Sequence, residues 1–328
     1  MHTRYTYLDT VGGIMIIHMM YVVHAAHFTN VSPWLVEYVM ELMTCFLPWF
    51  YFKSGMFYKD GSSLIEDFAK RVKKLLLPFA VFSFIGWGLI FILGSLWMTD
   101  ASVVDLLKDS LSTFLWEGAF NGNFALWFLF SLFLVCVTYR MLRKLRINNR
   151  VIMLLSFACA WGIYQFDLSF PTYVGNFCNG LFFYSLGVEL KQKQFYNALF
   201  YASCLILVIS AFLPSYLDFR ANKILIGHQS YLLVELYCFA GIIFFNNIFY
   251  RFFPNRIPLL THVGENSMKY YVVHYIFLIG LFRLLTMVFH LSNPIALFLI
   301  IVVIMTILLY FSGRILSMKT FAVLMGEH

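Results

Sequence analysis

The chain has 328 residues, of which 61% are hydrophobic and 12% are charged. Soluble globular domains average about 45–50% apolar and about 25% charged residues, so this composition excludes a water-soluble fold and indicates a polytopic membrane protein. The formal net charge of +7 is explained by loops that face anionic lipid headgroups, and it gives no support to nucleic-acid binding.

Ten long apolar runs follow one another along the chain. A helix that crosses the bilayer needs about 20 predominantly apolar residues, and the runs are close to that length. They cover 11–28, 34–58, 75–97, 125–142, 151–166, 172–190, 196–214, 231–250, 268–290 and 294–317. We therefore expect an all-α fold with about ten transmembrane helices.

Basic residues are concentrated in alternate gaps between these runs and near the two ends of the chain. Seventeen of the 23 Lys and Arg residues belong to this set: Arg4, Lys59, Lys70, Arg71, Lys73, Lys74, Arg140, Arg143, Lys144, Arg146, Arg150, Lys191, Lys193, Arg251, Arg256, Arg314 and Lys319. The other gaps hold Lys108, Arg220 and Lys223. Since short cytoplasmic loops carry an excess of Lys and Arg, both termini are expected in the cytoplasm, in agreement with an even number of spans.

The chain is expected to form a single transmembrane domain over residues 1–328, with no soluble appended domain. The first run contains His18 and His24 and lacks a small-residue cleavage site, which favours a retained helix over a removable signal peptide. The longest external segment, 98–124, is compatible with either a short amphipathic helix over the outer mouth or a solvated loop.

Ionisable side chains at membrane depth are the candidates for chemistry, because they are costly there and usually face a cavity or a partner. His24 and His27 lie in or beside the first run, and His274 lies in the ninth. Histidine titrates near neutral pH, which suits a general base, although single histidines in apolar helices commonly serve packing or hydrogen bonding. A metal site needs further converging ligands that the neighbouring sequence lacks, so we expect none. Arg283 is expected to form an ion pair with Glu235.

A run of basic residues, Lys70-Arg71-Val72-Lys73-Lys74, precedes Pro78 and the third apolar run. Guanidinium and ammonium groups bind phosphates through charge-assisted hydrogen bonds. The run is therefore a candidate for holding the phosphates of a nucleotide-like donor. Ordinary anchoring at the cytoplasmic surface explains the same cluster, and the sequence leaves both interpretations open.

Several motifs, taken in order, resemble membrane acyltransferase family 3. The opening segment from Tyr7 to Ile17, running on to His24, is similar to a family opening with an Asp, a basic residue, a small residue and then a histidine about one helix length into the membrane. Further matches are Phe52-Lys53-Ser54-Gly55-Met56, Arg71-Val72-Lys73-Lys74-Leu75-Leu76-Leu77-Pro78, Leu126-Trp127-Phe128-Leu129, Phe182-Phe183-Tyr184-Ser185-Leu186-Gly187, and Val263-Gly264-Glu265-Asn266-Ser267-Met268-Lys269-Tyr270-Tyr271-Val272-Val273-His274. This series spans nearly the whole chain.

The resemblance implies an integral membrane O-acyltransferase that takes an acyl group, commonly acetyl, from cytoplasmic acyl-CoA. The acceptor it implies is a sugar hydroxyl in a cell-surface polysaccharide or a lipid-linked glycan precursor. The expected location is the bacterial inner membrane. The expected partners are acyl-CoA (acetyl-CoA as co-substrate), the glycan acceptor and membrane lipids.

On this interpretation His24 is the predicted general base, which takes the proton of the acceptor hydroxyl as its oxygen attacks the thioester carbonyl. His274 is expected to line the same cavity as a second proton-transfer or donor-binding group, and His27 is an alternative base. The residues predicted to bind the donor are Arg71, Lys74, Lys70, Ser267 and Lys269.

The sequence departs from the family pattern at two places. Gly12 and Gly13 stand where family members have a basic residue, and Val23 stands where the histidine is expected, so that His24 comes one residue late. On a regular helix one residue rotates a side chain by about 100°. A π-helical bulge near His24 would restore its direction.

Two functions of other classes remain as alternatives. A transporter or flippase for a glycolipid or small molecule would use the histidines and Arg283 to line a translocation path, although the paired repeats of many transporters are not visible in this sequence. A catalytically inactive family member with a structural role would be consistent with the missing basic residue. A transporter moves its substrate unaltered, and an inactive member does not bind acetyl-CoA.

Overall fold

The structure is a computed structural model that describes residues 5–31, 39, 43–61, 63–97, 103–166, 168, 170–191, 193–212, 217–218, 226–227 and 231–326. Arg4, Arg220 and Lys223, from the pattern of basic residues, lie outside the described residues, as does most of the beginning of the second predicted run. Everything below concerns the described part of the chain.

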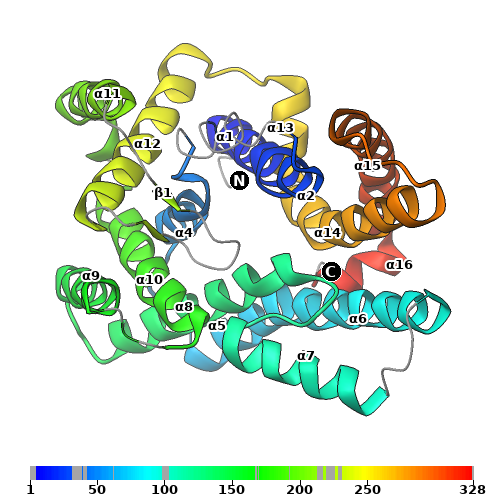
Figure 1. The fold of residues 1–328 in the computed structure, drawn as a ribbon. Coiled ribbons are helices and arrows are strands. Elements are labelled where there is room, and N and C mark those ends of the chain that lie inside the picture. The colour runs from blue at the N-terminus through cyan, green and yellow to red at the C-terminus, as the bar shows by residue number, and fades with distance from the viewer. Residues whose placement is uncertain are drawn as a thin grey trace.

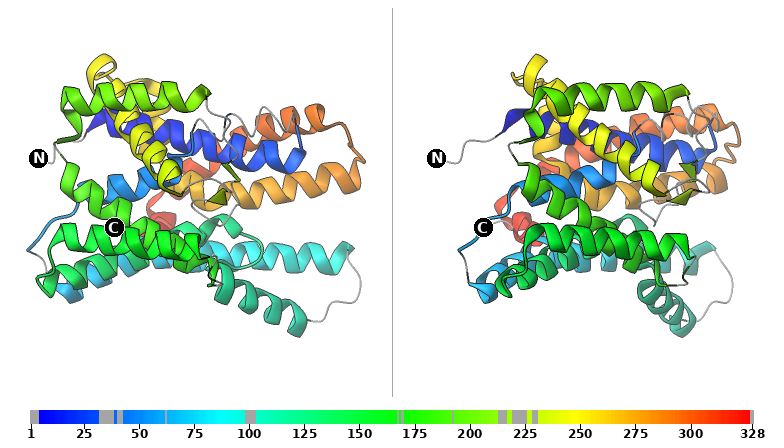
Figure 2. Two further views of the ribbon diagram at one scale, coloured as in Figure 1. Left: turned by 60° about the vertical axis from the view of Figure 1, so that its left-hand side comes forward. Right: turned by 90° about the vertical axis from the view of Figure 1, so that its left-hand side faces the viewer.

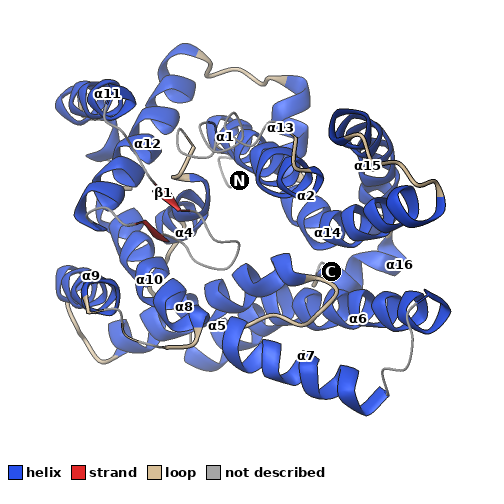
Figure 3. Ribbon diagram, in the orientation of Figure 1, coloured by secondary structure: helices blue, strands red, loops and turns tan. Residues whose placement is uncertain are grey.

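Helices make up almost all of this structure (Figure 3). The α-helices are α1 (Thr6–Ile17), α2 (His27–Thr29), α4 (Phe46–Met56), α5 (Leu64–Arg71), α6 (Leu77–Trp97), α7 (Val103–Glu117), α8 (Trp127–Lys144), α9 (Asn149–Gln165), α10 (Thr172–Leu190), α11 (Asn197–Phe212), α12 (Tyr231–Phe252), α13 (Pro258–Glu265), α14 (Ser267–Arg283), α15 (Pro294–Leu316) and α16 (Lys319–Ala322). Segments His18–Ala26, Val72–Leu76 and Leu284–Val288 are π-helical, and Phe124–Leu126, Lys193–Phe195 and Val323–Met325 are 3₁₀-helical. Strands β1 (Leu217–Asp218) and β2 (Ile226–Gly227) form a short antiparallel ladder.

A helix overlaps each of the ten predicted apolar runs. Among the described residues, six helical segments are long and apolar enough to cross a membrane: Thr6–Thr29, Leu64–Ile92, Phe124–Lys144, Tyr231–Phe252, Ser267–Val288 and Pro294–Leu316. The full count of about ten spans and the cytoplasmic location of both termini remain predictions. The segment 98–124 is predicted to be either a short helix or a solvated loop. Helix α7 occupies most of it, so the segment is mainly helical.

Many of the helices run side by side, seen nearly end-on in Figure 1 and from the side in Figure 2. Helix α4 lies in the interior, where it packs against α10, α1 and α12. Its Trp49, Tyr51 and Phe52 are completely buried. The two polar groups among them are satisfied, because Trp49 Nε1 donates to Asn246 Oδ1 at 2.8 Å and the Tyr51 hydroxyl donates to Ser131 at 2.7 Å.

Helices α1 and α13 pack so closely that their backbones touch. A Cβ atom at Gly13 would overlap the carbonyl of Leu260, and one at Gly264 would overlap the carbonyl of Asp9. Small residues permit such close approach of helices in a membrane. A hydrogen bond of 2.9 Å between Thr10 and Thr261 closes the same contact. Gly13, the second of the two glycines that stand where family members have a basic residue, therefore has a packing role.

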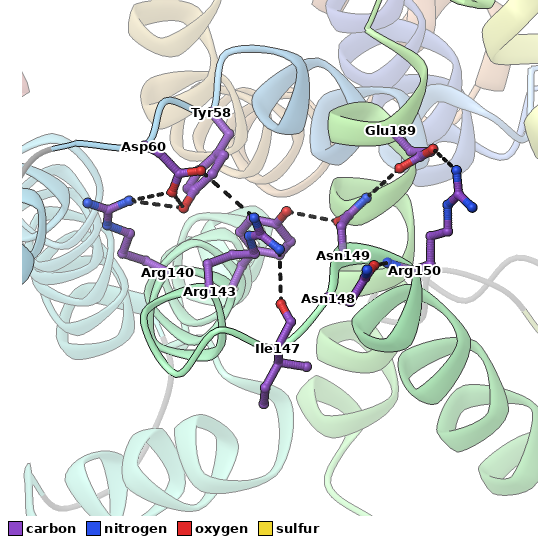
Figure 4. Close-up of polar contacts among 10 residues, drawn as sticks. Tyr58, Asp60, Arg140, Arg143, Ile147, Asn148, Asn149, Arg150 and Glu189 are labelled. Atoms are coloured by element: carbon purple, nitrogen blue, oxygen red, sulfur yellow. Dashed lines mark hydrogen bonds and ion pairs between the residues drawn. The ribbon is translucent and has the colours of Figure 1, made fainter.

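One end of α8, α9 and α10 is joined by a network of ion pairs (Figure 4). Asp60 is paired with Arg140 at 3.1 Å and with Arg143 at 3.9 Å. Glu189 is paired with Arg150 at 3.3 Å and with Lys193 at 2.9 Å. These basic residues belong to the set that the sequence places in the cytoplasm, and here they connect helix ends to one another.

Candidate active site

Two histidines from distant parts of the sequence meet in the interior. His24 lies in the π-helical segment that follows α1, and His274 lies in α14. The Nδ1 atom of His24 is 2.9 Å from Nε2 of His274, a hydrogen-bonding distance. The ring planes are 19° apart, and His274 is completely buried. The structure thus brings together the two histidines that the sequence proposed for one cavity.

The hydrogen bonds of this pair determine where its protons lie. His274 Nδ1 is 2.7 Å from the backbone carbonyl oxygen of Tyr271, which can only accept, so Nδ1 carries the hydrogen. In a neutral ring the other nitrogen is then an acceptor, and it must accept from the N–H at Nδ1 of His24. With both rings neutral, the unshared electron pair of His24 is therefore on Nε2, where a general base needs it.

His24 lies within a π-helical segment, the kind of local winding that would restore the direction of its side chain. The segment begins at His18 and ends at Ala26, and π-helical turns occur often at functional sites. Within it His18 is buried against the ring of Phe46 in α4, whereas His24 faces α14. His27 follows the π-helical segment and is exposed, so the structure does not bring it into the pair.

A chain of aromatic contacts begins at the pair and continues along the two helices. The ring of Tyr275 stands edge-on to His24 with centroids 5.3 Å apart, and Phe28 contacts Tyr275 in the same way at 5.7 Å. Phe28 also packs on Phe282 at 5.7 Å. The contacts pair His24 with His274 and Phe28 with Phe282, so the two helices run in the same direction.

A cavity of about 190 Å³ adjoins the pair through Tyr271. Its walls come from α1, α4, α8 and α14 and consist of Ile16, Met19, Leu47, Phe50, Lys53, Ser54, Phe128, Leu129, Leu132, Ser267, Met268 and Tyr271. The lining is mostly apolar, with Lys53, Ser54 and Ser267 as its polar groups. A few convergent polar groups in an apolar pocket are typical of small-molecule sites.

Lys53 is a site residue that the sequence reasoning missed. Its Nζ lies 3.8 Å from Asp9 Oδ1 and 5.0 Å from the centre of the Trp49 ring. A Cβ atom at Gly12 would be 3.4 Å from Lys53 Nζ and 3.3 Å from Trp49. Helix α4 therefore brings a positive charge to the place where α1 carries only a glycine. A lysine inside an apolar run was the available signal, because such residues are functional candidates.

The sequence comparison agrees with this arrangement. Residues 7–314 match a family described as an acyltransferase domain. The chain belongs to acyltransferase family 3. Searches among curated proteins and among solved structures gave no match. Family membership and the apolar helices together indicate an integral membrane acyltransferase.

Among the donor-binding residues predicted for this acyltransferase, Ser267 lines the cavity and Arg71 lies close to it. Arg71 is half-buried, with Nη1 3.3 Å from the sulfur of Cys136 and Nε 3.7 Å from Asp67. Cys136 is one helical turn beyond Leu132, a cavity residue. The guanidinium group of Arg71 is thus about one turn away from the cavity wall.

The other predicted donor-binding residues are not gathered at the cavity. Lys70 and Lys74 are exposed at the surface of α5 and the π-helical turn after it. Lys269 Nζ donates a hydrogen bond of 2.9 Å to Oγ of Ser317, the C-terminal cap of α15. Since Ser317 lines a different depression from the one that contains Ser267, the two predicted residues of α14 belong to opposite sides of that helix.

Proposed function

We propose that this family member transfers an acyl group, commonly acetyl, from cytoplasmic acyl-CoA to a hydroxyl of a cell-surface polysaccharide or a lipid-linked glycan precursor in the bacterial inner membrane. The observation that carries the proposal is the hydrogen-bonded pair of His24 and His274, in which His24 Nε2 keeps an electron pair that can accept a proton. A cavity of about 190 Å³ is connected to this pair by Tyr271, which lines the cavity and contacts His274. A transferase of this kind needs a base and a place for the donor, and these are the roles that we propose for His24 and the cavity.

The proposed reaction begins with the acceptor hydroxyl near His24. His24 Nε2 takes the proton as the hydroxyl oxygen attacks the thioester carbonyl and forms a tetrahedral intermediate. The intermediate collapses with cleavage of the carbon–sulfur bond, and the proton on Nε2 passes to the departing thiolate to give free CoA. The products are the sugar ester and CoA, with His24 returned to its neutral form.

His274 acts as a positioning residue in this reaction. It accepts the Nδ1 hydrogen of His24 and donates its own to Tyr271, so it fixes both the orientation and the proton position of the base. The same division between a base and the group that orients it occurs in catalytic triads. When His24 is protonated, its Nδ1 hydrogen bond becomes charge-assisted and stronger.

The cavity is the proposed place of the reacting end of the donor. Its volume of about 190 Å³ is below the roughly 300–1,000 Å³ of pockets that hold whole drug-sized ligands, so it suits a short acyl group and its thioester. Ser267 is the candidate for donating to the developing oxyanion, because the Ser54 hydroxyl donates its hydrogen to the Phe50 carbonyl. Lys53 and Arg71 place positive charge beside the phosphate-bearing donor, and Lys70 and Lys74 would meet it at the surface.

The test is turnover by the purified full-length protein in nanodiscs, with acetyl-CoA and lipid-linked glycan from the native host. Thiol release and glycan acetylation are compared in wild type, His24→Ala, His274→Ala and His27→Ala. His290→Asn is the matched control, because His290 is exposed and has a positive φ of 50° that Asn tolerates.

We expect His24→Ala to abolish both signals while the protein stays folded. Loss confined to His27→Ala would transfer the role of base to His27. Binding of acetyl-CoA without turnover, together with movement of an unmodified substrate across the membrane, would support the transporter alternative. Absence of acetyl-CoA binding in wild type would support the inactive-member alternative.

A further inference from the structure

A second depression lies on the opposite side of α14 from the cavity. It has a volume of about 440 Å³ and is formed between α13, α14 and α15 by His262, Asn266, Tyr270, Tyr310, Gly313, Arg314 and Ser317. We call it the α14–α15 groove. The neighbouring residues Tyr270 and Tyr271 line the groove and the cavity respectively, so α14 is the wall between them.

The groove is positively charged. Arg314 lies in its wall with the guanidinium group 4.8 Å from the centre of the Tyr310 ring. The ammonium group of Lys269 reaches its edge through the hydrogen bond to Ser317. Among the residues that the structure describes, none that lines the groove is acidic, and the nearby Glu265 pairs with Arg256 at 3.0 Å. The charge of this lining therefore favours an anion.

Hydrogen-bond donors surround this charge. The Tyr310 hydroxyl is in the wall, as is the side-chain amide of Asn266, which donates one of its two hydrogens to the His262 carbonyl. The Tyr270 hydroxyl lies 3.2 Å from His262 Nε2. A guanidinium group stacked on an aromatic ring keeps its N–H edge available in the ring plane. Arginine, lysine and hydroxyl donors together are the groups that bind phosphate oxygens.

The groove lies at the end of a candidate membrane span. It is built on the last turns of Pro294–Leu316, and the surface beside it is apolar, since Phe311 and Ile315 are 56% and 47% exposed. An anionic head with an apolar tail fits this combination. Basic pockets between transmembrane helices are known to hold the head groups of anionic lipids.

We propose that the α14–α15 groove binds a phosphate ester through Arg314 and Lys269. The phosphate is either the head group of an anionic membrane lipid or part of a soluble nucleotide. The proposal does not depend on the proposed transferase reaction, because binding is measured without turnover.

The test is native mass spectrometry of the full-length protein in detergent, in two arms. One arm titrates dioleoylphosphatidylglycerol, with dioleoylphosphatidylcholine measured separately to give the non-specific adducts. The other titrates adenosine 3′,5′-bisphosphate. Each is run on wild type, Arg314→Gln, Lys269→Gln and the control Lys144→Gln, which removes the positive charge of an exposed side chain at the end of α8, outside the groove.

We expect Arg314→Gln and Lys269→Gln each to weaken binding about tenfold, as for the loss of a charged hydrogen bond, and Lys144→Gln to leave it unchanged. A loss confined to the lipid arm assigns the site to a membrane lipid, and a loss confined to the bisphosphate arm assigns it to a soluble ligand. Equal binding by wild type and both groove variants in both arms overturns the proposal. If Arg314→Gln is unfolded, Arg314→Lys serves instead, and unchanged binding by that variant together with Lys269→Gln has the same meaning.

Discussion

The ion-pair network around Asp60 and Glu189 and the histidine pair are both polar clusters that join separate helices, but they differ in what they leave unpaired. In the network each carboxylate meets two basic groups: Asp60 pairs with Arg140 and Arg143 (Figure 4), and Glu189 pairs with Arg150 and Lys193. In the pair, a single chain of hydrogen bonds runs from His24 through His274 to Tyr271 and leaves one nitrogen of His24 as an available acceptor. The first arrangement joins helix ends, and the second leaves free the nitrogen that we propose as the base.

The largest effect is expected at His24. His24→Gln keeps an amide that can donate to His274 but has no basic nitrogen, so we expect kcat to fall by about 10²–10⁴-fold. The melting temperature should change little, because the hydrogen bond to His274 is retained. The measurement is steady-state acylation alongside thermal unfolding. A kcat within threefold of wild type would remove His24 from the role of base.

Substitution of His274 should lower kcat by less than substitution of His24. His274→Phe keeps a ring in the same space and removes the acceptor for His24 Nδ1, so the orientation and proton position of the base are lost. Losing one buried hydrogen bond to a group that becomes charged corresponds to about ten- to hundredfold in kcat. The KM for acyl-CoA should change little. An equal rise in KM with unchanged kcat would make His274 a donor-binding residue instead.

A substitution in the ion-pair network is expected to lower the stability of the protein and to leave its activity unchanged. Asn149 accepts from the Tyr139 hydroxyl at 2.8 Å and donates to the Ser185 carbonyl at 3.1 Å and to Glu189 at 3.3 Å. Asn149→Leu leaves buried polar groups without partners, which costs about 1–3 kcal/mol for such a group. Denaturant unfolding in detergent measures the loss, and kcat per folded molecule should be unchanged.

Arg150→Gln is the matched control for that variant. It removes an ion pair of a side chain that is 71% exposed, and exposed pairs contribute about 0–1 kcal/mol. A loss of stability as large as that of Asn149→Leu would show that the charges, and not the buried hydrogen bonds, hold these helix ends together.

The smallest expected effect concerns Lys53. Lys53→Gln removes the positive charge from the cavity wall, and because the side chain is partly exposed we expect the KM for acyl-CoA to rise only about fivefold. Lys53→Arg should keep the wild-type value. If Lys53→Gln and Lys53→Arg have the same KM, the charge acts on Asp9 and not on the donor.

Much of the helical framework could be predicted because hydropathy and length determine it. The run 172–190 coincides with α10, and the run 294–317 exceeds α15 by one residue. Helix α13 was not predicted, since eight residues with both polar and apolar side chains carry no transmembrane signal. Its position depends on Gly264 and on the facing surface of α1, which only the folded chain reveals.

The candidate site was predictable in its members but not in its contacts. His24 and His274 stand out as histidines in apolar helices, yet they are 250 residues apart, and nothing local indicates that they touch. The expected ion pair of Glu235 with Arg283 is wrong. Glu235 is buried, and in the described part of the structure neither carboxylate oxygen has a hydrogen-bond partner. Pairing between distant helices follows from packing, and charge type alone does not determine it.

The touching backbones of α1 and α13 also determine where α14 begins. Gly13 meets Leu260 and Gly264 meets Asp9, so α1 and α13 run in opposite directions. The chain turns at Asn266, between α13 and α14, and α14 then runs in the same direction as the helix that follows from α1, as the contacts of His24 with His274 and of Phe28 with Phe282 show. The glycine contact thus anchors the reversal of the chain that carries His274 back to His24.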